Sequence, residues 1–312
     1  MSAQPVKTVF LDYDTVSTGD LDLTALHAVS GDLILYDSDE TLTLERIRDA
    51  DVVLLNKLPL TRGLLSGACK LKLVALAATG TNNVDLGAAR ERGIGVCNVR
   101  AYCTASVVQH VWGLILSLTQ HVAEFSRGST HDPLSHPIRE LNGRIFGVVG
   151  WGELGRGSAR IAEAFGMRVI VANRPGSASQ AGRVPLEELL AMADIVSLHC
   201  PLTDATRGLI GARELGLMKP DALLINTARG ALIDGAALAA ALKKGRLGGA
   251  GIDVLPHEPP LDDEPLIDSE VPNLLVTPHI AWAAREARQR CVDEMAANIR
   301  DFYGGGRRGR VV

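Results

Sequence analysis

The feature that most limits how this chain can fold is an apolar, β-branched run that leads directly into three glycines, at residues 145–155. The pattern predicts a strand, a tight turn and the start of a helix. Gly150 lets the chain turn sharply, Gly152 allows backbone to approach a pyrophosphate, and Gly155 lets the helix pack close to its strand. We therefore predict a dinucleotide site with the diphosphate at the helix N-terminus.

A short glycine motif is weak evidence in a chain with 32 glycines, so the flanking residues must support it. Apolar and small residues recur at helical spacing over residues 154–165, and residues 168–172 have the composition of the next buried strand. The glycines therefore lie in the strand, turn, helix and strand order that a dinucleotide site needs.

The length of 312 residues and the hydrophobic content of 46% predict two α/β domains. Before residue 99, short apolar runs alternate with amphipathic stretches, which predicts a first parallel unit without a glycine-rich phosphate loop. A long helix, apolar on most faces, is predicted from Thr104, and strands and helices then alternate as in a doubly wound sheet. The last amphipathic helix has no following strand, so we expect it to pack on the first domain.

Three polar segments are predicted to be irregular. Residues 125–137 favour a surface loop, and the glycine- and arginine-rich residues 304–310 favour a frayed, solvated tail. The small polar residues 77–85 follow a strand and can offer backbone N–H groups to a carboxylate. The other interpretation is an ordinary loop in which Asn83 or Asp85 caps the next helix.

Composition excludes several classes of function. The net charge of −4 comes from interspersed acids and bases, without the basic stripe that nucleic acid binding requires. The five cysteines show no C-x-x-C spacing, so we expect reduced, buried thiols and no metal site. Neither a signal peptide nor an apolar run of about eighteen residues is evident, so we expect a soluble, cytoplasmic protein without a membrane partner.

Polar side chains follow three predicted strands at their carboxyl ends, the edge where an open parallel sheet binds its ligands. Arg229 follows one strand, Asp253 and Glu258 follow the next, and His279 follows the last. Each has an ordinary alternative, as a helix cap, a solvated loop carboxylate or a core histidine. Their convergence on the edge that also carries the glycine turn predicts an active site beside a nicotinamide.

Four segments resemble the signatures of the D-isomer-specific 2-hydroxyacid dehydrogenases. They are residues 199–206, 226–230, 251–259 and 277–281. Within that family, residues 77–85 and Trp282 are most similar to bacterial glycerate dehydrogenases, also called hydroxypyruvate reductases. The resemblance covers nearly the whole chain.

The resemblance implies a fold and an assembly. Residues 100–284 would form a Rossmann nucleotide domain, and residues 1–99 with 285–312 a smaller, discontinuous, flavodoxin-like substrate domain. The helix that begins near Thr104 would help to build a homodimer. The segment at residues 126–135 is shorter than the corresponding segment of the family, which contributes to the dimer. The sequence therefore does not define the oligomeric state or the residues that form the far wall of the substrate pocket.

The resemblance also implies a chemical role for three side chains. Arg229 would pair with the substrate carboxylate and polarise the keto group, for which a planar guanidinium is suited. His279 would exchange a proton with the carbonyl oxygen, and Glu258 would hold the imidazole and favour its charged form. The hydride chemistry belongs to the cofactor.

The remaining implied positions contact ligands, with Asp253 against the nicotinamide amide. The expected substrate-binding positions are Ala78, Thr79, Gly80 and Trp282. The expected cofactor-binding positions are Gly150, Gly152, Glu153, Leu154, Gly155, Asn173, Arg174, Cys200, Pro201, Thr206, Thr227, Ala228 and Asp253.

The choice of dinucleotide depends on the end of the strand at residues 168–172. An acidic residue about 20 positions after the glycine turn normally binds the ribose 2′-OH and repels a 2′-phosphate. Here Asn173 and Arg174 take that place, so a hydroxyl can still be bound and no acid rejects a phosphate. We predict that NADPH is preferred and NADH is also used. The alternative is that Arg174 faces solvent and NADH is the cofactor.

We therefore predict hydride transfer between NAD(P)H and a small 2-keto acid, with hydroxypyruvate and D-glycerate as the first choice. Glyoxylate or a bulkier 2-keto acid is the nearest alternative, because sequence does not define the volume of the pocket. A non-catalytic, dinucleotide-sensing corepressor is the alternative from another class. Long polar or Pro/Ser-rich extensions that would recruit partners are missing from the sequence, which argues against the corepressor.

Overall fold

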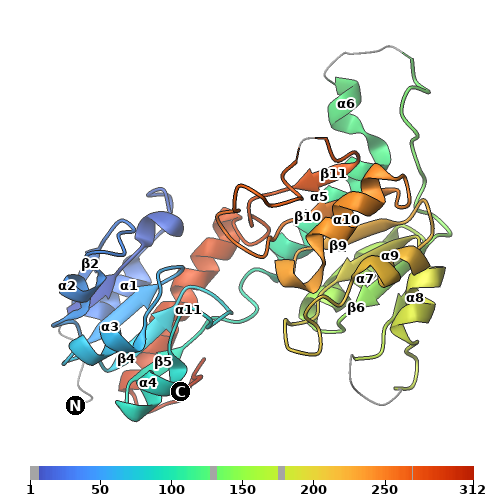
Figure 1. Cartoon of the computed structure of the whole chain (residues 1–312). Helices are drawn as coiled ribbons and strands as arrows, with labels where there is room; N and C mark the ends of the chain where they lie inside the picture. The colour runs from blue at the N-terminus through green and yellow to red at the C-terminus, as the bar shows by residue number, and fades with distance from the viewer. Residues whose placement is uncertain (1–6, 127–131, 175–179, 269) are drawn as a thin grey trace. The chain divides into compact units, whose positions relative to one another are not determined.

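The structure is a computed structural model that describes residues 7–126, 132–174, 180–268 and 270–312. The chain divides into two compact units, which are Met1–Cys103 with Ala283–Val312, and Thr104–Trp282. Each unit contains one parallel sheet with helices packed on it (Figure 1). The predicted fold class, with a doubly wound sheet and a second, smaller α/β unit, is confirmed.

Among the described residues, no helix combines the length and the apolar character that crossing a membrane requires.

The first unit has five parallel strands in the order β2-β1-β3-β4-β5, which is the flavodoxin-like order. The strands are β1 (Lys7–Phe10), β2 (Asp32–Leu35), β3 (Val52–Leu55), β4 (Leu73–Leu76) and β5 (Gly95–Cys97). The helices are α1 (Thr24–Ser30), α2 (Thr43–Ile47), α3 (Arg62–Gly67), α4 (Leu86–Glu91) and α11 (Arg285–Tyr303), with a 3-10 turn η1 (Tyr13–Thr15). Sequence patterns did not indicate β5, because three residues are too few to show a period.

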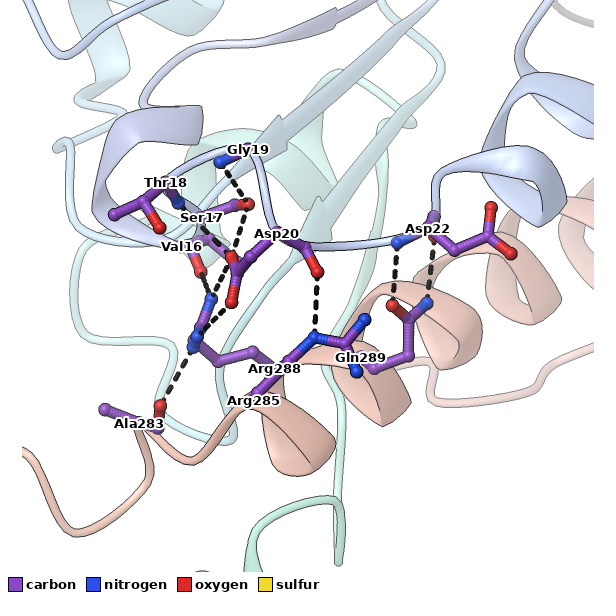
Figure 2. Close-up of polar contacts among 10 residues, drawn as sticks. All are labelled: Val16, Ser17, Thr18, Gly19, Asp20, Asp22, Ala283, Arg285, Arg288 and Gln289. Atoms are coloured by element: carbon purple, nitrogen blue, oxygen red, sulfur yellow. Dashed lines mark hydrogen bonds and ion pairs between the residues drawn. The ribbon is translucent and has the colours of Figure 1, made fainter.

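The start of α11 is fixed to the loop after η1 by an ion pair and backbone contacts (Figure 2). Arg288 donates to both carboxylate oxygens of Asp20, at 2.9 and 2.7 Å, and to the carbonyl oxygen of Val16 at 3.0 Å. Gln289 exchanges two hydrogen bonds with the backbone of Asp22. The Arg288 guanidinium holds the pKa of the Asp20 carboxyl well below its usual range. These contacts tie a C-terminal helix to residues that precede it by more than 260 positions.

The C-terminal residues are docked on the first unit, so the prediction of a frayed tail is wrong. The backbone N–H of Val311 donates to the carbonyl oxygen of Val96 at 2.8 Å, and Arg310 pairs antiparallel with Cys97 of β5. The side chain of Val312 packs against the hydrophobic core of the unit. A glycine- and arginine-rich composition favours solvation, but strand pairing over a long sequence separation is invisible to local composition.

The second unit has six parallel strands in the order β11-β10-β9-β8-β6-β7. They are β6 (Ile145–Val149), β7 (Arg168–Val171), β8 (Ile195–Leu198), β9 (Leu223–Asn226), β10 (Gly249–Ile252) and β11 (Leu274–Val276). From β6 the chain moves outward to β7 and then crosses back to β8 on the other side of β6. The carboxyl ends of β6 and β8 therefore flank the switch point where such sheets bind ligands.

Helices cover both faces of the second sheet. One face packs against α5 (Thr104–Gln120) and α7 (Glu153–Ala164). The other packs against α8 (Leu186–Met192), α9 (Ala212–Leu217) and α10 (Gly235–Lys243). A 3-10 turn η2 (Gly230–Leu232) follows β9, and α6 (Val122–Ser126) follows α5. Strands buried on both faces explain the continuous apolar runs in the sequence.

Two sequence expectations need qualification. The predicted loop at residues 125–137 begins inside α6, and residues 127–131 of the short segment 126–135 lie outside the described residues. All five cysteines are free, and Cys97, Cys200 and Cys291 are buried as predicted. Cys69 is exposed, because it lies in the turn after α3, so the expectation of buried thiols is wrong there.

Candidate active site

The turn after β6 requires two of its glycines. Gly150 has φ of 109°, and a Cβ there would lie 2.5 Å from the backbone nitrogen of Cys200 and 2.6 Å from the carbonyl carbon of His199. A Cβ on Gly155 would collide with the carbonyl oxygen of Gly150. The backbone N–H of His199 also donates to Val149 at 2.7 Å. The glycines thus let the ends of β6 and β8 and the first turn of α7 approach one another.

Gly152 differs from these two glycines. It is the exposed N-cap of α7, and a Cβ there would have no neighbour within 4 Å among the described residues. The fold therefore gives no steric reason for glycine at this position, whereas a ligand that approaches backbone at a helix N-terminus does. Glu153 begins the helix and accepts a hydrogen bond from the Thr104 hydroxyl at 2.6 Å, and Leu154 is half-buried beside it.

The loop after β8 is held by its own side chains. The hydroxyl of Thr206 donates to the carbonyl oxygen of Pro201 at 2.7 Å and accepts from the backbone N–H of Thr203 at 2.8 Å. Cys200 is buried and Pro201 is exposed. The predicted cofactor positions on this loop thus form one rigid turn at the carboxyl end of β8.

Two buried polar atoms near this edge have no hydrogen-bond partner within the described part of the chain. They are the hydroxyl oxygen of Thr227, directly after β9, and Nδ1 of His199. Loss of solvation lowers the pKa of His199 to about 4, so its imidazole is neutral, and its Nε2 lies 2.9 Å from the Ser197 hydroxyl. Because a buried polar atom normally has a partner, these atoms and the glycine cradle fit a polar ligand such as a dinucleotide.

The end of β7 carries the predicted ribose-binding positions. The side-chain amide oxygen of Asn173 accepts from the backbone N–H of Gln180 at 3.1 Å, and the backbone N–H of Asn173 donates to the carbonyl oxygen of Val184 at 2.8 Å. Arg174 is exposed. The structure therefore positions Asn173 through neighbouring backbone and leaves the Arg174 side chain at the surface.

Arg229 is carried by a turn that Asn226 holds together. The Asn226 side chain is fully buried, donates to the carbonyl oxygen of Arg229 at 2.9 Å and accepts from the N–H of Ala228 at 3.0 Å. A Cβ on Gly230 would collide with the backbone of Leu255, so the turn after β9 packs directly on the loop after β10. Arg229 and the loop that contains Glu258 are thereby brought to the same edge.

His279 and Glu258 form a close pair. The Nδ1 atom of His279 lies 2.6 Å from Oε2 of Glu258, and Oε1 of Glu258 accepts from the N–H of Leu255 at 3.1 Å. An ionised carboxylate only accepts hydrogen bonds, so Nδ1 carries a proton and Nε2 is the atom left for proton exchange. The predicted convergence of Arg229, Glu258 and His279 on one sheet edge therefore agrees with the loop geometry.

Asp253 is buried between these loops and has no exposed surface. Its Oδ1 accepts from the Thr277 hydroxyl at 2.6 Å and the Ile280 N–H at 2.9 Å, and its Oδ2 accepts from the Ala281 N–H at 2.9 Å. Nε2 of His110, on α5, lies 3.3 Å from Oδ1. Burial raises the pKa of Asp253, but the donors of His110, Thr277, Ala281 and Ile280 outweigh it and hold that pKa below its usual value.

Sequence reasoning did not single out His110 or Ser106. Both are polar residues on a largely apolar helix, separated by four positions, and so lie on one face of α5. The hydroxyl of Ser106 donates to the carbonyl oxygen of Ala281 at 2.5 Å. A polar pair at this spacing on an apolar helix was the available signal.

The predicted carboxylate-binding turn belongs to the first unit. Asn98 donates to the carbonyl oxygen of Thr79 at 2.7 Å, and the Thr79 hydroxyl donates to the carbonyl oxygen of Val99 at 2.8 Å. Thr79 is exposed, and Ala78 and Gly80 are half-buried. The turn at the carboxyl end of β4 is therefore held in a defined conformation. Trp282, which is half-buried, belongs to the second unit.

The two candidates for the helix cap near this turn have different roles. Asp85 caps α4 by accepting from the backbone N–H of Ala88 at 2.8 Å. Asn83 instead donates to the carbonyl oxygens of Asn56 and Leu58, at 3.2 and 3.1 Å, and so ties the turn after β4 to the loop after β3. The interpretation of Asp85 as the cap is confirmed, and that of Asn83 is wrong.

The family model of the D-isomer specific 2-hydroxyacid dehydrogenase NAD binding domain matches residues 109–281. A protein of Haemophilus influenzae assigned to the 2-hydroxyacid dehydrogenases is 46% identical over 272 residues, which cover 83% of this chain and 86% of that protein. A glycerate dehydrogenase of Methylorubrum extorquens is 39% identical over 308 residues, 96% of each chain.

Solved structures resemble the whole chain as well. A protein of Thermus thermophilus has a TM-score of 0.85 at 32% identity, covering 98% of this chain and 100% of its own. An acyclic imino acid reductase, solved in complex with NADPH and D-Arg, has a TM-score of 0.85 at 28% identity, also covering 98% of this chain and 100% of its own.

Proposed function

Since the chain belongs to the family of D-isomer-specific 2-hydroxyacid dehydrogenases, we propose that it interconverts hydroxypyruvate and D-glycerate. The family reaction is hydride transfer between a nicotinamide dinucleotide and a 2-keto acid. The observation that carries the proposal is the 2.6 Å contact between His279 and Glu258 at the sheet edge that also holds the glycine turn. The preference for hydroxypyruvate is supported by the similarity to a glycerate dehydrogenase over nearly the full length.

In this proposal three side chains handle the substrate. When bound, the nicotinamide supplies or accepts the hydride. His279 donates a proton from Nε2 to the carbonyl oxygen during reduction and removes it during oxidation. Glu258 accepts from Nδ1, orients the ring and stabilises its charged form. Arg229 pairs with the substrate carboxylate through its planar guanidinium and polarises the keto group.

The two units have separate roles in this scheme. The second unit, residues 104–282, binds the dinucleotide through the glycine turn and the loops after β7, β8 and β9. The first unit, with its C-terminal helix, is the substrate domain, and backbone groups at Ala78, Thr79 and Gly80 receive the substrate carboxylate. Trp282 lines the substrate side near His279. The firm hydrogen bonding of the turn after β4 supports this role, because a preorganised turn binds an anion without reordering.

Asp253 has a different role in the proposal from the one that the resemblance implies. Its carboxylate has no exposed surface and already accepts from the Thr277 hydroxyl and the Ile280 and Ala281 N–H groups. A nicotinamide amide would have to reach a carboxylate that has no surface open to a ligand. The contacts therefore support a role in holding residues 277–281 over direct contact with the cofactor.

NADPH is proposed as the preferred cofactor, with NADH also used. No acidic residue stands at position 173 or 174 to repel a 2′-phosphate, and the exposed Arg174 has the charge and geometry to pair with one. The amide of Asn173 suits a ribose hydroxyl. A solved relative of similar fold is described as an NADPH complex, which makes this choice compatible with the architecture.

A homodimer and a cytoplasmic location complete the proposal. Val122, Leu134 and Ile138 are 64%, 87% and 55% exposed, which is unusual for large apolar side chains that lie close together in sequence. Such exposure supports an interface with a second copy. Five free cysteines suit the reducing conditions of the cytoplasm.

The deciding experiment is an assay of NADPH and NADH oxidation with hydroxypyruvate, glyoxylate, pyruvate and phenylpyruvate. We expect the highest kcat/KM for hydroxypyruvate. A higher kcat/KM for glyoxylate would leave the proposed reaction class unchanged and would identify glyoxylate as the preferred substrate. No turnover of any keto acid, combined with tight binding of the dinucleotide, would favour the corepressor-like alternative.

A further inference from the structure

One face of α5 contacts the segment that carries His279. Ser106 and His110 lie four residues apart on α5 and therefore point to the same side of the helix. The Ser106 hydroxyl donates to the carbonyl oxygen of Ala281 at 2.5 Å, and Nε2 of His110 lies 3.0 Å from the Thr277 hydroxyl. The helix α5 thus contacts the segment 277–281 at both of its ends, Thr277 and Ala281.

The direction of the hydrogen bonds follows from proton counting. The carboxylate of Asp253 only accepts, so the Thr277 hydroxyl, 2.6 Å from Oδ1, must donate its single proton to it. The Thr277 oxygen can then only accept from Nε2 of His110. Nε2 of His110 therefore carries a proton, which it shares between Thr277 and Oδ1 of Asp253 at 3.3 Å.

This chain of hydrogen bonds ends at the backbone of His279 and of the two residues that follow it. The Asp253 carboxylate accepts from the N–H groups of Ile280 and Ala281, and the Asp253 carbonyl oxygen accepts from the N–H of His279 at 2.8 Å. His279 has φ of 54°, a left-handed conformation that a non-glycine residue keeps only where its surroundings fix it. The Asp253 carboxylate therefore helps to fix the conformation in which His279 presents its ring.

We propose that His110 is a positioning residue for His279. It anchors the Thr277 hydroxyl and the Asp253 carboxylate, which in turn hold the backbone at residues 279–281. The inference rests on the proposed role of His279 as the proton donor. His110 contacts none of the reacting groups in this scheme, so its removal misplaces the imidazole without weakening the binding of either ligand.

The kinetic test compares His110→Leu with His110→Gln. Leucine removes the donor, and glutamine keeps an N–H near the position of Nε2. We expect kcat of His110→Leu to fall about 10- to 100-fold, because a displacement of the reacting group by about 1 Å has an effect of that order. KM for the keto acid and the dissociation constant of the dinucleotide should change less than about threefold. His110→Gln should recover most of kcat.

The pathway is tested by combining His110→Leu with Thr277→Val, which removes the hydroxyl at nearly constant shape. If His110 acts through Thr277, the double variant should be hardly slower than the slower single variant, because both break the same link. If the fold-losses in kcat of the two single variants multiplied in the double variant, His110 would not act through Thr277. A lower kcat that His110→Gln does not rescue would likewise overturn the donor role of His110.

A second readout does not depend on activity. Amide hydrogen exchange at Ile280 and Ala281 should speed up by about tenfold in His110→Leu and stay near the wild-type rate in His110→Gln. The exposed His27→Leu in α1 is the matched control and should leave both amides unchanged. Unaltered exchange at residues 280–281 in His110→Leu, or faster exchange throughout the second unit, would overturn the inference. If the wild type reduced no 2-keto acid, the proposed function would fail while this exchange experiment still decided the role of His110.

Discussion

The imidazole of His279 and the carboxylate of Glu258 lie 2.6 Å apart, with 32% and 31% of their side chains exposed. They come from loops 21 positions apart in the sequence, after β10 and β11, which are neighbouring parallel strands. The pair is thus fixed by the protein on one side and open to a ligand on the other. This geometry is what a general acid needs, and it leads to the first two predictions.

Replacing His279 with alanine should lower kcat by about two to four orders of magnitude, because general acid–base transfer contributes that much. The dissociation constant of the dinucleotide should stay within about threefold of wild type, since the glycine turn proposed to bind it lies on other loops. Steady-state kinetics and a fluorescence titration of the cofactor measure the two effects. If dinucleotide binding collapsed, His279 would be a structural residue.

Replacing Glu258 with glutamine should shift the pH profile of kcat/KM for reduction toward lower pH. Reduction needs the charged imidazole, and a neutral amide 2.6 Å away no longer stabilises that charge as the pH rises. The rates are measured between about pH 5 and 9, the range in which a histidine changes charge. A profile that did not move would separate Glu258 from the proton transfer.

Replacing Arg229 with lysine should reduce kcat/KM by about 10- to 100-fold or more, because one charge-assisted hydrogen bond is worth about 1.5–3 kcal/mol. A compact ammonium cannot reproduce the two parallel contacts of a guanidinium with a carboxylate. The exposed Arg246→Lys is a matched control that should retain wild-type kinetics. Equal kinetics for the two variants would remove Arg229 from the substrate site.

Replacing Asp253 with asparagine should lower the free energy of unfolding at pH 7 by about 1–3 kcal/mol. The reason is that the side-chain NH2 of asparagine would face one of the buried donors from which the carboxylate now accepts a hydrogen bond. The pKa of Asp253 is lowered in the folded protein, so its stabilisation is complete above the unfolded value of about 3.9 and is lost as the pH falls through the folded value. The difference between wild type and variant in urea unfolding should therefore shrink below about pH 4. The exposed Asp204→Asn serves as the control, and an effect no larger than this control's would mean that the donors contribute little.

The kcat/KM values for NADPH and NADH decide the cofactor. We expect NADPH to be preferred, because an arginine pairs with a 2′-phosphate and no acid opposes it. Asn173→Asp combined with Arg174→Ala should then swing the preference toward NADH, because it adds a repelling charge and removes an attracting one. A wild-type preference for NADH above about a hundredfold, roughly 2.7 kcal/mol, would contradict the role of Arg174.

Much of the fold was readable from local patterns, because each pattern reports the period of one element. The long helix predicted from Thr104 is α5, which begins at that residue, and the glycine turn was predicted with its neighbouring strands. A glycine with a positive φ and a collision in place of its Cβ, as at Gly150, leaves a signature in the sequence itself. Residue chemistry at strand ends was readable for the same reason, since parallel strands bring their carboxyl ends together.

Other features depended on contacts between residues far apart in the chain. Residues 304–310 look solvated by composition, but Arg310 pairs with Cys97 of β5 across about two hundred positions. Asn83 looked like a helix cap, but its side chain reaches the carbonyl oxygens of another loop. No local period or composition contains such partners.

Sequence by itself determined the residue types, the strand ends that carry Arg229, Glu258 and His279, and the glycines that the turn requires. Only the tertiary structure decided that His110, 167 positions before Thr277, shares a hydrogen bond with it, and that the Asp253 carboxylate is satisfied by its own chain. The physical reason is that the periodicity of residue types along a helix or strand specifies only which face of the element each side chain occupies. Its hydrogen-bond partners follow from how α5 packs on the sheet, which brings a donor and an acceptor within about 3 Å of each other.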